Sequence, residues 1–195
     1  KKPGFDVEAQ QLAHELRTIL GIGGLTGLRV INRYDVEGID EELFERCVPI
    51  VFSEPQVDTA THELPVEGIK LTETGTVASA PADTAVFAVE YLPGQFDQRA
   101  DSASECVQLI SAGDRPSVRS AKVYALTGAL AEADVEAIKH YVINPVEARE
   151  ASLAPKATLK MSVATPQPVE VLDGFLDLDE DGLAAFIADR GLAMD

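Results

Sequence analysis

The densest group of functional side chains in this chain lies near its middle, directly after a run of apolar residues. Amide, carboxylate, guanidinium and hydroxyl groups are brought together there by Gln95, Asp97, Gln98, Arg99, Asp101 and Ser102. Ligands and partner proteins often bind where a few polar groups converge beside an apolar surface. The cluster therefore predicts a contact surface. The competing interpretation is a well-capped, solvated start of a helix.

Two other motifs are similar to ligand sites but lack residues that such sites need. The run Gly21–Gly27 is rich in glycine, yet a phosphate loop follows a strand, opens a helix and closes on Gly-Lys-Ser or Gly-Lys-Thr. The run Asp177–Gly182 begins like an EF-hand calcium loop, but Ala188 stands where that loop needs a bidentate glutamate. We predict a helix end with a turn for the first run and an acidic helix cap for the second.

The other reactive residue types are dispersed. The three histidines have no cysteine or second histidine at metal-ligand spacing. Cys47 and Cys106 lack the glycines that flank a nucleophile at a sharp turn, so both are predicted to be buried structural thiols. Two cysteines in 195 residues indicate a reducing cytoplasm. No residue of the chain is predicted to be catalytic or to bind a cofactor or a metal.

The net charge of the chain limits the kinds of molecule that it is expected to bind. The chain has 33 acidic and 16 basic residues, which gives a formal net charge of −17. A surface this negative repels phosphate backbones and anionic membranes, so neither a nucleic acid nor a membrane is an expected partner. Apolar residues are 46% of the chain, enough for a globular core. No apolar run approaches the about 20 residues of a membrane span.

The elements that position the polar cluster belong to an internal repeat. Pro3-Gly4-Phe5-Asp6 recurs as Pro93-Gly94-Gln95-Phe96-Asp97. Four further identities lie 90 positions apart, namely Arg29 with Arg119, Tyr34 with Tyr124, Gly38 with Gly128 and Pro55 with Pro145. Because glycine and proline fix backbone turns, matches at these residues predict the same turns at the same places.

Apolar periodicity gives both copies the same order of elements. The first copy predicts a helix from Asp6 to about Leu20 with Leu12, Leu16, Ile19 and Leu20 inward, a strand over 28–37, a helix over 40–47 that Pro49 ends, and a short strand near 57–64. The second copy predicts a helix from Asp97 with Ala100, Ala103, Val107 and Ile110 inward, a strand over 118–126, a helix over 131–142 and an extended segment after Pro145.

The second copy has one element more. Its apolar run Ala85–Leu92 is typical of a central strand that is buried on both faces. The counterpart in the first copy falls just before Lys1, so we expect the first unit to lack its first strand and the chain to be a piece of a longer protein.

The fold class predicted from these patterns is α/β, more closely α+β. Two tandem strand–helix–strand–helix–strand units, 1–64 and 84–153, are joined by a loop at 65–83 and are expected to pack sheet to sheet as a pseudo-dimer within one chain. A linker region, 154–195, follows this duplicated domain of 1–153 and carries a C-terminal helix from about Asp179 to Arg190.

Several of these stretches resemble the N-terminal region of phosphoribosylformylglycinamidine synthase. They are Lys1–Asp6, Arg33–Gly38, Tyr91–Ser102, Ile143–Glu147 and the closing Gly191–Asp195, and the similarity covers essentially the whole chain. The resemblance implies a purine-biosynthesis ligase, a glutamine amidotransferase that converts formylglycinamide ribonucleotide to the amidine. It also implies ATP and magnesium for the whole enzyme.

In large single-chain members of that family, the N-terminal domain resembles a dimer of the small PurS subunit and is architectural. The resemblance thus implies a non-catalytic assembly domain that joins the synthetase and glutaminase domains of the same cytoplasmic chain and helps to form the ammonia route. The family's synthetase histidine motif, nucleotide and magnesium ligands and Cys-His-Glu triad have no counterpart in these residues. The cluster Gln95–Ser102 is then expected to be an interdomain contact.

The alternative is a free-standing regulatory domain that binds a small metabolite between two ferredoxin-like units. For either function, an unpaired sheet edge would expose the chain to self-association.

Overall fold

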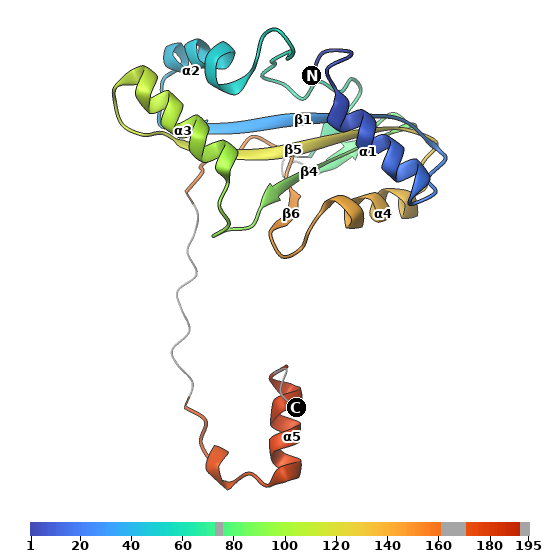
Figure 1. Ribbon diagram of the computed structural model, residues 1–195, viewed down its shortest axis with the longest axis vertical. Coiled ribbons are helices and arrows are strands. Elements are labelled where there is room, and N and C mark those ends of the chain that lie inside the picture. Colours follow the sequence, from blue (N-terminus) through green and yellow to red (C-terminus); the bar gives the residue numbers. More distant parts are fainter. Residues whose placement is uncertain (73–75, 161–170, 192–195) are drawn as a thin grey trace. The chain divides into compact units, whose positions relative to one another are not determined.

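The computed structural model describes residues 1–72, 76–160 and 171–191, and the chain divides into two compact units, Lys1–Met161 and Ser162–Asp195. One antiparallel sheet forms the centre of the first unit (Figure 1). Its strands, in spatial order, are β1 (Leu25–Glu37), β5 (Ser117–Gly128), β4 (Thr84–Tyr91) and β6 (Ala148–Ala151). The predicted mixture of helices and strands is confirmed.

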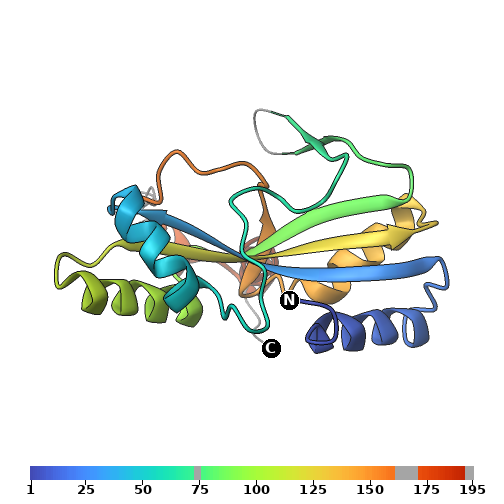
Figure 2. The same ribbon diagram turned by 90° about the horizontal axis from the view of Figure 1, so that it is seen from above.

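Helices cover one face of this sheet, as Figure 2 shows from above. They are α1 (Val7–Thr18), α2 (Glu41–Cys47) with the π-helical turn η1 (Val48–Phe52), α3 (Gln98–Ser111) and α4 (Glu132–Val142). Strands β1, β4 and β5 and helices α2, α3 and α4 lie within three residues of the predicted positions. Strand β4 is buried on both faces as expected, since Val86, Phe87 and Ala88 are at most 8% exposed.

Two apolar clusters hold the helices on the sheet. Towards one end of the sheet, α1 and α4 contribute Leu16 and Ile138, which are fully buried against Leu25 and Leu126. Towards the other end, Ala100 and Ala103 of α3 pack on Val118, with Val51 and Phe52 of η1 against them. The inward face predicted for α3 is thereby confirmed.

The inward face predicted for the first helix is partly wrong. Ala9, Ala13 and Leu16 are its buried positions, one helical face at spacings of four and three. The helix ends at Thr18, and Ile19, which lies beyond that end, is 67% exposed. The early stop moves Ile19 out of the apolar stripe.

The opposite face of the sheet is covered by the chain between the two copies. Val86, Ala88, Val123 and Ala125 form the buried part of this cluster, and Leu64, Val66, Ile69 and Val77 pack over them. The segment 65–83 was expected to be a surface loop, but it contains the small hairpin of β2 (Lys70–Leu71) and β3 (Val77–Ser79). Its apolar side chains make it a cover for the sheet.

The short strand expected near 57–64 is absent, since no residue of that range is in a strand. A strand needs a neighbour that pairs with its backbone. Within the described part of the chain, the one backbone hydrogen bond that joins this range to a distant segment is 2.7 Å long and runs from the N–H of Lys2 to the carbonyl of Val57.

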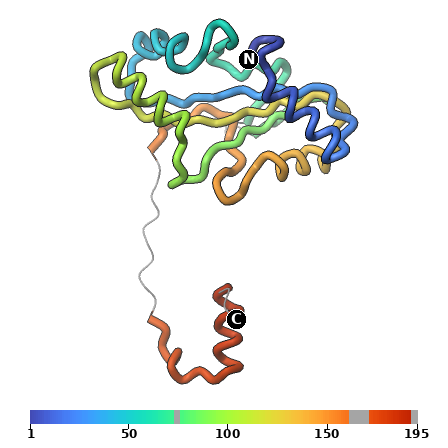
Figure 3. Tube along the Cα trace, viewed as in Figure 1, coloured from blue at the N-terminus to red at the C-terminus, as the bar shows by residue number. Residues whose placement is uncertain are grey.

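The expected packing of two units sheet to sheet is wrong. β1 and β5 pair with each other, so both copies of the repeat contribute to one continuous sheet, and Figure 3 shows these two strands side by side. In this pairing Val30 lies opposite Tyr124 and Asn32 lies opposite Lys122. Asn32 and Lys122 are themselves 90 positions apart, the interval of the repeat.

Backbone hydrogen bonds recur at the same interval. The N–H of Phe5 donates to the carbonyl of Lys2 at 3.0 Å, and 90 residues later that of Gln95 donates to Leu92 at 3.0 Å. Two further matched bonds are Lys2 to Val57 with Leu92 to Glu147, at 2.7 and 2.9 Å, and Val57 to Glu54 with Glu147 to Asn144, at 2.9 and 3.1 Å. The shared glycines and prolines thus coincide with shared turns.

After β6 the chain stays attached to the first unit. Arg33 of β1 donates to the carbonyls of Ser152 and Ala154 at 2.8 and 2.7 Å. The backbone N–H of Leu159 donates to the carboxylate of Glu37 at 2.8 Å, and Leu159 is only 8% exposed. Residues 154–160, assigned from the sequence to a linker, are therefore packed on the duplicated part.

In the second unit, a 3-10 turn η2 (Phe175–Asp177) precedes α5 (Glu180–Asp189), and α5 has no buried residue. Asp179 accepts a 2.9 Å hydrogen bond from the N–H of Gly182, so the acidic run does cap the last helix. Residues 161–170 of the predicted linker region lie outside the described residues. None of the helices in the described ranges combines the length and apolar character that a membrane crossing requires.

Candidate functional site

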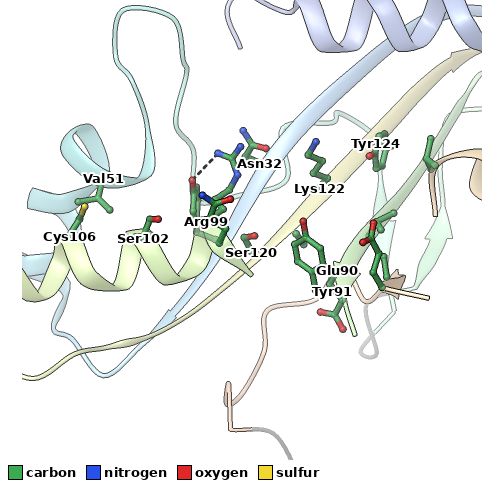
Figure 4. Close-up of a pocket in the computed structure, with 18 of the residues that line it drawn as sticks. Asn32, Val51, Glu90, Tyr91, Arg99, Ser102, Cys106, Ser120, Lys122 and Tyr124 are labelled. Carbon is green, nitrogen blue, oxygen red and sulfur yellow. Dashed lines mark hydrogen bonds between the residues drawn. The ribbon is translucent and has the colours of Figure 1, made fainter. Parts of the chain in front are cut away.

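A cleft of about 690 Å³ opens on the helical face, in the middle of the sheet (Figure 4). Its floor is a row across three strands, formed by Asn32, Lys122 and Val89. The helices leave this row uncovered because α1 and α4 pack towards one end of the sheet and α3 and η1 towards the other. Apolar side chains from the neighbouring elements, Ile50, Val51 and Val142, line its walls.

One wall of the cleft is a polar face of α3. Gln98, Arg99, Ser102 and Cys106 line it, at spacings that place them on one side of the helix. Three of these residues belong to the cluster predicted from the sequence. Within the described part of the chain, the side chains of Gln98 and Ser102 have no hydrogen-bond partner, so they are free to bind a ligand or another protein.

Arg99 is the most distinctive group in the cleft. Its guanidinium donates a 3.3 Å hydrogen bond to the hydroxyl of Tyr34, which raises the pKa of Arg99. No carboxylate of the described residues forms an ion pair with it, although acidic residues outnumber basic ones two to one. A guanidinium has five donors in a fixed fork that matches a carboxylate. Arg99 thus offers unused donors to an acceptor in the cleft.

The opposite side of the cleft differs in charge. Glu8 of α1 pairs with Lys122 at 2.5 Å, so this cation is already neutralised. Burial raises the pKa of Tyr124 to about 12, and the nearby charge of Glu8 adds to the increase. Glu8 is the counterpart of Arg99 across the repeat, counted from the helix-opening residues Asp6 and Asp97. These two equivalent positions of the repeat therefore have opposite charges.

The other half of the predicted cluster lies elsewhere. Asp97 is 8% exposed and accepts three hydrogen bonds of 2.9 Å, from the N–H of Ala100 and from the N–H and hydroxyl of Ser120. It caps α3 and ties that helix to β5, which is a structural role. The interpretation as a capped helix start therefore holds for Asp97.

Asp101 and Gln95 also face away from the large cleft. Asp101 forms an ion pair of 2.6 Å with Arg115, and the amide of Gln95 donates to the carbonyl of Val146 at 3.4 Å. Together with Asp97, both line a smaller cleft of about 330 Å³. The six predicted residues are thus divided between two sides of α3, and only Gln98, Arg99 and Ser102 point into the central cleft.

Three cleft residues were not predicted as site residues because they lie on strands, far from the polar cluster in the sequence: Asn32, Tyr34 and Lys122. A signal was present, since Asn32 interrupts the inward apolar series of Leu28 and Val30. Cys106 was predicted to be buried but is exposed in the cleft, because it lies on the side of α3 that carries Gln98, Arg99 and Ser102. Cys47 is buried as expected.

No group of three or more histidine, cysteine, aspartate or glutamate side chains in the described ranges is arranged to hold a metal ion. The chain as a whole matches no protein-family model, no curated protein and no solved structure.

Proposed function

We propose that this chain is the N-terminal, non-catalytic assembly domain of a phosphoribosylformylglycinamidine synthase. In this proposal two PurS-like units, 1–64 and 84–153, form a pseudo-dimer that organises the synthetase and glutaminase domains of the same larger chain and the route for ammonia. The observation that carries the proposal is the pairing of Asn32 with Lys122, two residues that the repeat makes equivalent.

The register supports an approximate two-fold relation between the copies. When two equivalent strands pair antiparallel about a two-fold axis, the residue at the axis lies opposite its own equivalent. Here that residue pair is Asn32 and Lys122, and the pairs on either side of it exchange: Val30 faces Tyr124 and Tyr34 faces Ser120. The recurring backbone hydrogen bonds support the same relation in the turns.

An assembly role fits the surface that this arrangement exposes. The central cleft lies at the proposed two-fold axis. Beside its apolar walls it presents the guanidinium of Arg99, which forms no ion pair with a carboxylate of the described residues. The second unit adds several exposed apolar side chains next to carboxylates, with Leu176 94% and Val171 80% exposed. Apolar side chains that the unit does not bury itself are typical of an interface with another protein or domain.

Complementation in trans tests this function. A synthase lacking its N-terminal region would be assayed for amidine formation with glutamine and, separately, with ammonia. We expect the added chain to associate with it and to restore the glutamine-dependent reaction. Arg99→Glu should weaken this association, whereas Lys70→Glu, on the exposed hairpin of the other face, should not. Lack of association, or tight binding of ATP or glutamine by the isolated chain in calorimetry, would contradict the proposal.

One observation favours the alternative of a regulatory domain that binds a small metabolite. The central cleft has the volume of a typical small-molecule site, about 300–1,000 Å³, and it lies between the two proposed units. A screen of carboxylate metabolites by ligand-observed NMR separates the two functions. Saturable binding that Arg99→Gln abolishes would favour regulation, and an empty screen with successful complementation would favour assembly.

A further inference from the structure

Among the strands of the described residues, β1 pairs only with β5, so its outer edge is an unpaired edge of the main sheet. An open strand edge presents N–H and C=O groups to which another strand can bind. In the second copy the corresponding strand is β5, and its residues 121–127 pair with β4 on the side away from β1. The equivalent stretch of β1 is 31–37.

Apolar side chains on both faces of this stretch are incompletely covered. Tyr34 and Val36 on the helical face and Ile31 on the opposite face are only partly buried. Their counterparts in β5 are Tyr124, Leu126 and Ala121, which are 7%, 0% and 7% exposed because β4 lies beside them. The first copy therefore has a sheet surface that is prepared for one more strand.

The backbone hydrogen bond that adjoins the β4–β6 pairing in the second copy recurs in the first copy. In the second copy the N–H of Leu92 donates to the carbonyl of Glu147. This hydrogen bond lies next to the last residue pair of β4 and β6, which is Tyr91 with Ala148. In the first copy Lys2 donates to Val57 in the same way. Beside that bond, the side chains of Lys1 and Asp58 form an ion pair of 3.0 Å. Lys1 and Asp58 are the equivalents of Tyr91 and Ala148.

We propose that the edge of β1 takes one further antiparallel strand, apolar on both faces as β4 is, whose last residue adjoins Lys1. It would lie between β1 and residues 58–61 and complete a second β4-like ladder. The register of β4 on β5, moved back by 90 positions, places the residue equivalent to Phe87 opposite Tyr34 and the one equivalent to Glu90 opposite Ile31. The inference rests on the repeat and holds for either function proposed above.

Strand addition by fusion tests the proposal. A copy of residues 84–90, Thr-Ala-Val-Phe-Ala-Val-Glu, is joined directly ahead of Lys1 in the full chain. We expect the fusion to raise Tm by at least about 3 °C, since roughly 1 kcal/mol shifts Tm by about 2–4 °C in a domain of this size. Hydrogen exchange of the β1 amides over 31–37 should slow at least about tenfold, since a factor of ten corresponds to about 1.4 kcal/mol.

A matched control carries one extra serine between the added strand and Lys1. The insertion shifts the register by one residue and turns every side chain to the wrong face, so Tm and exchange should stay near those of the parent chain. The proposal is overturned if the fusion leaves both quantities unchanged, or if the control stabilises equally. It is also overturned if sedimentation shows that the parent chain dimerises and that the dimer itself protects 31–37, because a second copy would then occupy the edge.

Discussion

Asn32 of β1 lies directly opposite Lys122 of β5, at the centre of the longest strand pairing in the molecule. The two residues have equivalent positions in the repeat but different charges. Lys122 is held by Glu8, whereas the side chain of Asn32 has no hydrogen-bond partner among the described residues. Among the described residues, the polar group on one side of this strand pair is therefore satisfied internally, and the one on the other side is not.

The Lys122–Glu8 pair should contribute little to stability. Both side chains are substantially exposed, at 40% and 58%, and exposed ion pairs stabilise by about 0–1 kcal/mol. Lys122→Gln is therefore expected to change the free energy of unfolding in urea by less than about 1 kcal/mol. A loss of several kcal/mol would show that the floor of the cleft is structural.

Asp97 should behave in the opposite way. Asp97→Ala removes a helix cap and leaves the N–H of Ser120 buried without its acceptor, which together should cost about 2–4 kcal/mol in urea unfolding. The matched control is Asp6→Ala in the first copy, because Asp6 makes no capping hydrogen bond to the backbone of α1. We expect the control to cost less than about 0.5 kcal/mol. Equal losses at both sites would contradict the structural role of Asp97.

These two aspartates show what could be predicted from the sequence. Asp6 and Asp97 both precede a helix, and both helices are present. Only the structure shows that Asp97 also bonds to β5, because the partner Ser120 lies 23 residues away and its counterpart in the first copy is Val30. Local patterns predict where elements begin, but they contain no information about contacts across the fold.

The same reasoning explains the errors in the predicted site and fold. Gln98, Arg99 and Ser102 were found because they are close together in the sequence, whereas Asn32 and Lys122 are brought into the cleft only by strand pairing. A sequence pattern that predicts helices on one face of each unit's sheet fits two arrangements, namely two sheets packed face to face and one sheet that both units share. The register of β1 on β5 decides for the shared sheet, and no local pattern contains that register.

A close backbone approach at the start of β1 gives a third prediction. A Cβ added to Gly24 would lie 2.2 Å from the carbonyl oxygen of Ala129, a contact that the backbone cannot accommodate without moving. Gly24→Ala should therefore destabilise the protein by about 2–4 kcal/mol in urea unfolding. At Gly23 a Cβ meets nothing within 4 Å, so Gly23→Ala is the control and should change stability by less than about 1 kcal/mol. Equal losses of stability for Gly24→Ala and Gly23→Ala would contradict the close approach of Gly24 to the carbonyl of Ala129.

Glu90 gives a prediction for the dependence of stability on pH. Burial alone would raise the pKa of its carboxyl group, but hydrogen bonds and charges from Lys156 and Arg149 outweigh this effect and lower the pKa. A lowered pKa in the folded state means that the ionised carboxylate stabilises the fold. That stabilisation is complete above the pKa of the unfolded chain, about 4.3, and is lost as the pH falls through the folded value.

Glu90→Gln removes this contribution. The variant should be less stable than the parent chain at pH 7, and the difference should shrink as the pH is lowered from about 5 to 3, within the range where a free glutamate titrates. Urea unfolding at each pH measures it. Glu147→Gln is the control for the loss of one negative charge, because it removes an exposed carboxylate near the same strand end that forms no ion pair among the described residues. A Glu90→Gln difference that is independent of pH would contradict the assignment.

The two cysteines should differ sharply in reactivity. Cys106 is exposed in the central cleft, whereas Cys47 is fully buried at the end of α2, and burial raises the pKa of the Cys47 thiol more than nearby Arg46 lowers it. Because the thiolate is the reactive form, only Cys106 should react quickly with a disulfide reagent at pH 8 in the folded protein. Cys106→Ser should abolish this fast reaction and Cys47→Ser should leave it intact, with both thiols reacting in the unfolded chains. A fast reaction of both thiols in the folded parent chain would show that α2 and η1 open readily. The cleft wall formed by Ile50 and Val51 of η1 would then not be a stable surface.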